Sequence, residues 1–400
     1  MKKIALIVCT IFALAFFVFD THITVNAYSG SASDEHKRED AENYIGETVD
    51  ELLDGLDLDG IDELFSDFSF FQGEGGAKER IKGLITGEYS IDSSEILKEL
   101  LNAFIGGLKG MAVPFAIIIA VAILTSVVEA VKPSFMDKSL SDLTYFVCFL
   151  VVVGVVSVLF NNVFSSVRKT TESLEKQSEV VFPIILTLMS ASGGSVSASV
   201  YEPQVAFLAK SMSYVVKTVL MPIILMLFVF SAVGSMSDRI KLDKTNAFLK
   251  SLFKWISGLT AVIFNFFVTA QGITASVYDG ASIKALKYAL GNSIPLVGNL
   301  VSGGFDVVMA SMILIKNAVG SFALIAVLFQ VLSPILGIAV LNLFLRLTSA
   351  VCEPIESHKL SGFLSAVADA TKYLTATAVL SASGYFITLL LTICSLGGAL

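Results

Sequence analysis

The side chains that could do chemistry are few. The chain contains only three histidines and four cysteines among 400 residues. It has no CxxC or HExxH spacing, no GxSxG sequence and no GxxxxGK[ST] loop, so the usual motifs for metal binding, nucleophilic catalysis and nucleotide hydrolysis are missing. We therefore expect a non-enzyme, with no catalytic residue, no cofactor-binding residue and no metal ligand.

One acid stands out because its surroundings are apolar. Asp306 is the single charge within the stretch Tyr288–Ile315. A carboxylate at membrane depth is a functional-site candidate, because hydrocarbon strongly disfavours charge. Asp306 could bind a coupling ion or a proton. The alternative is a structural role, either in a short hydrogen bond between helices or at an interruption of the span.

Three glutamates form a second candidate group. Glu129, Glu202 and Glu353 follow the first, third and seventh apolar stretches of the chain. If every stretch crosses a membrane, these carboxylates face the same side and could surround a pore mouth. Otherwise they are ordinary residues of the membrane interface.

The elements that must position these residues are long apolar segments. Hydrophobic residues make up 54% of the chain and charged residues only 16%, against roughly 25% charged in a soluble domain. Eight stretches, broken only by charge, are each long enough or nearly long enough to span a bilayer as a helix. They are Gly110–Val128, Leu143–Val167, Val180–Tyr201, Thr218–Ser237, Trp255–Tyr278, Tyr288–Ile315, Asn317–Leu345 and Tyr373–Leu400. The sequence predicts an all-α, polytopic membrane protein with seven to eight hydrophobic segments.

The third stretch has an unusual composition, because residues 190–199 are almost all serine, alanine or glycine. Small residues allow helices to pack closely in membranes. Alternatively, Gly193 and Gly194, followed by Ser195, break the helix at membrane depth, as in transporters with discontinuous helices. Both interpretations remain open at this stage.

The N-terminal part has the features of an exported segment. Lys2 and Lys3 precede 16 uncharged residues and the small residue Ala27, which predicts a signal peptide, residues 1–27, cleaved after Ala27. An uncleaved anchor helix is the alternative. Residues 28–88 form an acidic, partly ordered extracytoplasmic segment, since 28–82 carry sixteen acids and five bases. The formal net charge of −8 and the lack of a basic domain make nucleic acid an unsuitable partner.

An amphipathic helix is expected over residues 89–110, just before the polytopic membrane domain, residues 111–400. Apolar residues recur at helical spacing from Ile96 to Leu108. This helix is expected to lie in the membrane interface, or else to pack on the acidic segment. The bases in the loops of an eight-span arrangement divide eight to nine between the two sides, so they do not set an orientation. If the third stretch does not cross the membrane, the division of bases between the two sides changes.

The membrane part resembles the stage III sporulation protein AE family of endospore-forming bacteria. The similarity rests on PIILTLMSASGG from Pro183 to Gly194, on Glu202-Pro203, on NAVG from Asn317, and on LTSAVCEPI from Leu347 to Ile355. It covers about residues 84–400, and the acidic segment carries no matching motif. The motifs are short and apolar, but they occur in order along one chain.

This resemblance implies a role that composition alone does not. Such proteins are expected in the mother-cell membrane around the forespore, as subunits of a channel or secretion-like complex that joins the two cells. Their expected partners are the lipid bilayer, an ATPase and ring-forming proteins of the same sporulation stage. The family implies no catalytic residues. The alternatives are a stand-alone secondary transporter that uses Asp306, and a membrane scaffold without a conduit.

Overall fold

The computed structural model describes residues 48–56, 60–61, 76–86, 93–135, 138–236, 242–267, 298–354 and 358–394. The described residues are helical apart from short turns, in agreement with the predicted all-α class. The predicted signal peptide, with its cleavage position after Ala27, lies outside the described residues. The boundaries predicted for the four segments of the chain stay predictions.

The described part of the chain contains six helical segments that are long and apolar enough to cross a membrane, whereas the sequence predicts seven or eight. They are Phe104–Val127, Leu143–Ala191, Ser195–Met236, Asp243–Phe267, Val308–Cys352 and Lys359–Ile393. The number differs because neighbouring apolar stretches belong to the same helix. These lengths and compositions indicate a multi-pass membrane protein.

Helix α7, Lys138–Ala191, joins the second stretch to part of the third. Its middle, residues 168–179, is polar but contains neither glycine nor proline, so the charges end the apolar run without ending the helix. Arg168 and Glu172 form an ion pair one turn apart, with Nε and Oε1 3.2 Å apart, which suits a continuous helix. At 54 residues, α7 is about 80 Å long, far more than the roughly 30 Å of bilayer hydrocarbon.

Helix α11, Gly298–Cys352, joins the sixth and seventh stretches. Lys316 separates these stretches in sequence, but its side chain is completely buried, and its Nζ donates to the backbone oxygen of Ile393, 2.8 Å away. Ile393 lies in the last turn of α12, His358–Cys394, where backbone carbonyls lack partners within the helix. The ammonium thus caps the negative end of α12, and the helix around it stays intact.

A tight turn at Ser192–Gly194 separates α7 from α8, Ser195–Val215. Gly193 has φ of 93°, a left-handed conformation that glycine adopts without steric cost. The amide of Gly194 donates to Met189 O (2.9 Å) and that of Gly193 to Ser190 O (3.2 Å). This hydrogen-bond pattern is the Schellman motif that ends many helices. The chain therefore reverses direction within the third apolar stretch.

The π-helical turn η2, Val216–Leu220, connects α8 to α9, Met221–Met236. It comes just before Pro222, which cannot donate to Thr218 and whose ring crowds that residue's carbonyl. A widened turn relieves this conflict without breaking the helix. As a result, Ser195–Met236 continues as one long element.

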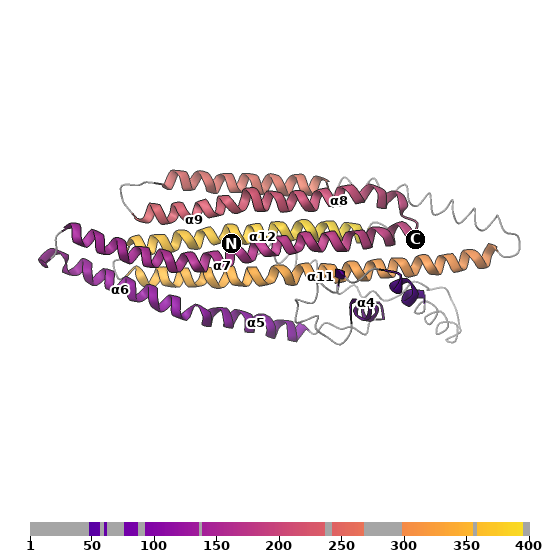
Figure 1. The fold of residues 1–400 in the computed structure, drawn as a ribbon, viewed down its shortest axis with the longest axis horizontal. Helices are drawn as coiled ribbons and strands as arrows, with labels where there is room; N and C mark the ends of the chain where they lie inside the picture. Colours follow the sequence, from indigo (N-terminus) through magenta and orange to yellow (C-terminus); the bar gives the residue numbers. More distant parts are fainter. Residues whose placement is uncertain are drawn as a thin grey trace.

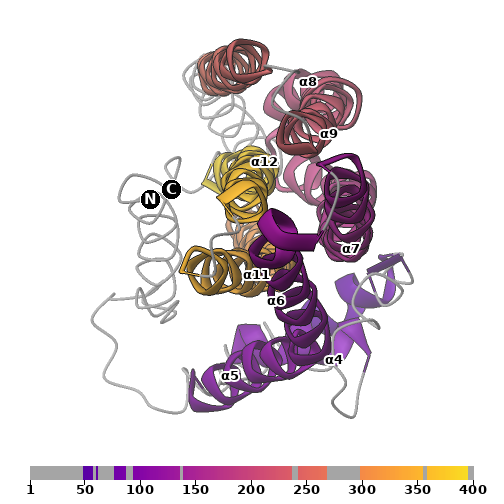
Figure 2. The ribbon, with the colours of Figure 1, turned by 90° about the vertical axis from the view of Figure 1, so that its left-hand side faces the viewer.

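The long helices form one elongated bundle (Figure 1). Helix α6, Ala112–Phe135, runs antiparallel to α7, and α11 runs antiparallel to both α7 and α12. Seen along the bundle, α7 lies on one side and α11 and α12 on the other (Figure 2). The hydrophobic core runs through all of these helices, and stacked rings such as Phe160 and Phe228, with centroids 4.5 Å apart, join α7 to α9.

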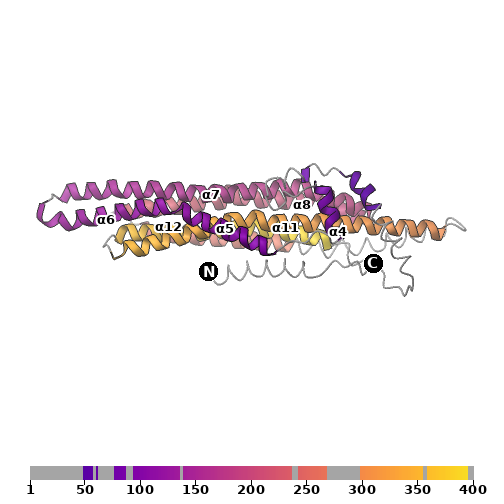
Figure 3. The same cartoon turned by 90° about the horizontal axis from the view of Figure 1, so that it is seen from below.

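Two shorter helices lie outside α11 (Figure 3). Helix α5, Ser93–Gly110, occupies the region of the predicted amphipathic helix and continues through Met111 into α6. It approaches α11 so closely that a Cβ atom on Gly107 would lie 3.2 Å from Cγ2 of Val340. Leu101 and Ile105 nevertheless remain about half exposed, and the membrane-interface position of this helix stays a prediction.

Helix α4, Ala77–Thr86, belongs to the acidic segment and docks on the bundle. Leu53 and Ile81 are buried in the common core, and Gly60 lies against Val180 of α7. Lys78 forms an ion pair with Asp54, and the hydrogen bond to this carboxylate raises the pKa of Lys78 above its ordinary value. The acidic segment therefore packs against the part of α7 that follows its polar middle.

Two glycines of α11 allow a test of this packing. At Gly320 a Cβ atom would overlap the Ile393 side chain, whereas at Gly337 it would meet nothing. We expect Gly337→Ala to raise stability by about 0.5–1 kcal/mol through helix propensity. Gly320→Ala should lower it by about 1–3 kcal/mol through overpacking. Thermal unfolding of the purified protein in detergent measures both, and equal effects would contradict the α11–α12 packing.

Candidate functional site

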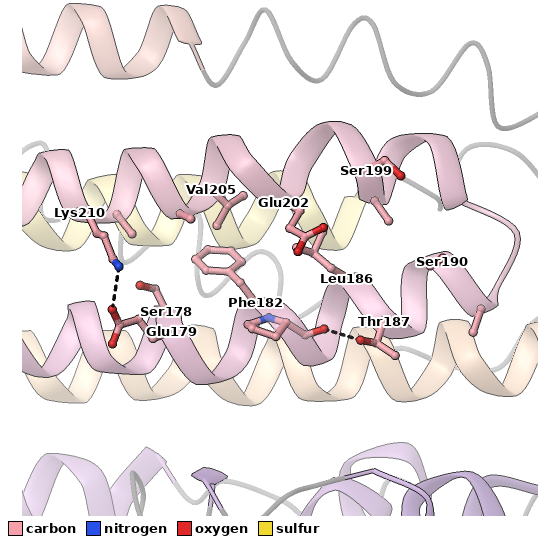
Figure 4. A pocket seen from close by; sticks show the side chains of 15 residues that line it. Ser178, Glu179, Phe182, Leu186, Thr187, Ser190, Ser199, Glu202, Val205 and Lys210 are labelled. Carbon is pink, nitrogen blue, oxygen red and sulfur yellow. Dashed lines mark hydrogen bonds and ion pairs between the residues drawn. The ribbon is translucent and has the colours of Figure 1, made fainter.

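The end of α7 and the start of α8 form a helical hairpin. An open cleft of about 670 Å³ lies between its two helices. Apolar side chains, including Phe182, Leu186 and Val205, form most of its wall. Figure 4 shows the Glu202 carboxylate between the two helices, near Leu186. We call this space the hairpin cleft.

The ionisable groups of the hairpin cleft are two glutamates and a lysine. Nζ of Lys210 lies 3.6 Å from Oε1 of Glu179, at the end of the cleft away from the turn. The described residues that line the cleft include no histidine and no cysteine. Such a surface suits binding of an apolar segment that carries a cationic group.

A second polar group lies where the polar middle of α7 meets α8 and η2. Glu175 accepts hydrogen bonds from Ser213 Oγ at 2.5 Å and from Lys217 Nζ at 2.7 Å. The side chains of Glu175 and Lys217 are only 24% and 28% exposed, so water screens this pair little. The π-helical turn holds Lys217, and π-helical turns are frequent at functional sites.

Further polar contacts at the same level connect α7 to α11 and α12. Gln177 Nε2 donates to Ala323 O at 2.9 Å, and the hydroxyls of Thr171 and Ser381 lie 3.4 Å apart. Together with the Glu175 group these contacts form a central polar layer across the bundle. They fix the helices relative to one another in both rotation and height.

The third group lies on the outside of α11 and α12, and we call it the α11–α12 charge cluster. Asp369 Oδ1 is 3.2 Å from Arg346 Nη2 and 2.5 Å from Lys372 Nζ. Asn342 orients the arginine by accepting from its Nε at 3.0 Å, and it also donates to the backbone oxygen of Ala368. One carboxylate between two cations leaves a formal charge of +1.

The structure does not bring the three predicted interface glutamates together. Glu129 lies near the end of α6, and Glu353 follows α11 at the same end of the bundle. Glu202 lies in α8 near the Ser192–Gly194 turn, toward the opposite end. They are separated because the chain reverses at Gly193, so the third stretch is not one crossing helix. Within one chain, the backbone of Glu202 is therefore far along the bundle from those of Glu129 and Glu353.

Asp306 lies in the first part of α11, ten residues before Lys316. The helix is continuous there, and the candidate membrane span begins two residues later, at Val308. Among the described residues, no group of three histidine, cysteine or acidic side chains is arranged to hold a metal ion. The roles predicted for Gly193, Gly194, Ser195 and Asp306 stay predictions.

Sequence reasoning missed the two best-defined charge groups. Lys217, Arg346 and Lys372 lie next to the ends of predicted apolar stretches, and their partners are up to 42 residues away. The spacing of Asp369 and Lys372, three residues apart, was the available signal, because such residues share a helix face. This spacing is easy to overlook, because Asp369 and Lys372 both lie outside the predicted apolar stretches.

The Glu175–Lys217 pair yields a second prediction. Lys217→Met should lower stability by about 1–3 kcal/mol, because it leaves a half-buried carboxylate with only Ser213 as partner. The control is Arg168→Gln, which breaks an ion pair whose arginine is 63% exposed and should change stability by less than about 0.5 kcal/mol. Thermal unfolding in detergent measures both, and equal effects would exclude a structural role for the Glu175 pair.

The comparisons with known proteins agree with one another. The family model for stage III sporulation protein AE matches residues 76–397. A curated relative, the stage III sporulation protein AE of Bacillus subtilis (strain 168), is 23% identical over 354 residues, which cover 86% of this chain and 88% of the relative. No solved structure matches. The match extends over all the long helices described above, and the chain therefore belongs to the stage III sporulation protein AE family.

Proposed function

We propose that this protein is a membrane subunit of the channel or secretion-like complex between mother cell and forespore, located in the mother-cell membrane. Membership of a sporulation protein family supports a role in sporulation, and the six long apolar helices support a multi-pass membrane subunit. Its proposed partners are an ATPase, which would supply the energy, and ring-forming proteins of the same sporulation stage. From the exposed charges of the α11–α12 charge cluster we infer that the chain works together with other proteins.

The α11–α12 charge cluster is costly for an isolated chain in lipid. The Arg346, Asp369 and Lys372 side chains are 44%, 41% and 40% exposed on the outside of the bundle. Charged side chains within membrane spans almost always face protein or a water-filled cavity. A subunit that assembles with other proteins provides such surroundings, which is the main structural support for the proposal.

The helix directions also support an orientation. Helices α6, α9 and α11 finish at the same end of the bundle, and in the sequence they are followed by residues 136–137, 237–242 and 353–357. Bases in or beside them are Lys132, Lys138, Arg239, Lys241, Lys244 and Lys359. The 268–297 connection contains only two, Lys284 and Lys287. An excess of bases marks the cytoplasmic side, so we propose that the acidic segment and the Ser192–Gly194 turn face away from the cytoplasm.

This orientation can be tested by cysteine labelling. In intact protoplasts of vegetative cells that produce the protein, a membrane-impermeant maleimide should label Lys284→Cys but not Lys244→Cys, and permeabilisation should expose Lys244→Cys. All four native cysteines are replaced by alanine in both variants. An arrangement with eight crossing stretches predicts the reverse pattern, so labelling of Lys244→Cys alone in intact protoplasts would overturn the six-helix orientation.

A secondary transporter that uses Asp306 is the competing function. The subunit proposal expects Asp306→Asn to form spores at nearly the normal frequency, because the residue has no assigned role in assembly. The matched change Asp369→Asn should reduce spore formation, because it removes the single anion of the α11–α12 charge cluster. Spore counts after heat treatment measure both.

Two further measurements separate the functions. Full-length tagged protein purified from sporulating cells should bring down the ATPase and the ring-forming proteins. Reconstituted alone in liposomes, it should move no solute along an ion gradient. Gradient-driven transport that Asp306→Asn abolishes would establish the transporter instead, and copurification of neither partner would leave only the scaffold alternative.

A further inference from the structure

The α11–α12 charge cluster lies at the depth of a strongly apolar part of the bundle. On α12, Asp369 is located between Phe363, whose ring packs against Phe149 of α7, and Ser381, which contacts Thr171. The segment of α7 between these two contacts includes most of the uncharged run Leu143–Val167. The cluster is therefore not at a charged helix end. The question is what the exposed charges contact outside this chain.

The most exposed residues on the outer face of α12 are small or polar along this depth. The exposed residues in the described part of α12 are Lys359, Gly362 and Ser365. Asp369, Lys372 and Ala376 continue the same face at helical spacing and are partly exposed. Among the described side chains of α12, no large hydrophobic residue is exposed. A lipid-facing helix would carry large apolar residues at these positions.

The opposite side of the bundle has the composition expected next to lipid. Helix α7 exposes Val147, Val151 and Val158. Helix α11 also exposes Leu343 and Leu347 beside Arg346, but α7 and the α11–α12 pair lie on different sides in Figure 2, and only the α11–α12 side carries charge at this depth. This asymmetry points to different surroundings for the two sides.

Direct contact between two copies through this face is unfavourable. Copies in one membrane share their orientation, so identical residues meet at the same depth. Two clusters, each with a formal charge of +1, would then repel each other strongly in a medium of low dielectric constant. Water between the copies screens this repulsion and solvates the exposed cations.

We propose that the outer face of α12 lines a water-filled path in the assembled complex and that Arg346 and Lys372 make this path favour anionic solutes. This inference rests on the proposed function, because neighbouring subunits must close the path. Rings of basic side chains select anions in pores, and cations at a narrow polar surface raise the local concentration of anions.

The test is cysteine accessibility in membranes of sporulating cells, with the native cysteines replaced by alanine. Ser365→Cys and Ala376→Cys should react with the negatively charged reagent sulfonatoethyl methanethiosulfonate at least about tenfold faster than Val158→Cys, the control on the apolar side. They should also react faster with this reagent than with its trimethylammonium analogue. Adding Arg346→Gln and Lys372→Gln should abolish the preference for the anionic reagent.

Three outcomes would overturn the proposal. Ser365→Cys and Ala376→Cys could stay as unreactive as Val158→Cys, which would place lipid or protein on the face. They could instead form disulfides between copies without reacting, which would make the face a dry homomeric contact. They could also react with no preference for charge, which would remove the role of Arg346 and Lys372. Copurification tests the subunit function separately, so a failure of the water-filled path is distinguishable from a failure of the proposed function.

Discussion

The structure depends on one constraint: helices about 80 Å long carry charged side chains, and each charge must find a partner or water. Lys316 meets this demand by capping the end of α12, and Glu175 meets it by binding Ser213 and Lys217. Because these charges are satisfied inside the bundle, α7 and α11 run through them without a break. The same contacts hold α7, α8, α11 and α12 in register.

Much of the fold follows from the sequence, since composition predicts an all-α membrane protein and apolar spacing places a helix close to Ser93–Gly110. The number of long helices does not follow from the sequence, because a charge that ends an apolar stretch need not end the helix. Lys316 shows why this rule fails: a buried lysine can bind a carbonyl 77 residues later. Hydropathy records that Lys316 is polar, but only the tertiary structure shows its acceptor.

The candidate sites were harder to predict than the helices. Gly193 and Gly194 pointed to a special conformation, and the left-handed Gly193 lies at the turn that reverses the chain. That reversal moves Glu202 away from Glu353, which no local pattern could reveal. Asp369 is missed for a related reason, because it lies between the seventh and eighth predicted apolar stretches. Its importance comes from Arg346 on another helix.

The difference between the two sides of the bundle follows from the same constraint. A charge that faces a neighbouring helix can be neutralised by one good partner, as for Glu175. In the α11–α12 charge cluster, Asp369 serves two cations, so one positive charge remains on an outward face beside an apolar part of α7. Lipid solvates that charge poorly, and an identical neighbour at the same depth repels it. Water, held between this face and neighbouring subunits, is the environment that satisfies the remaining charge.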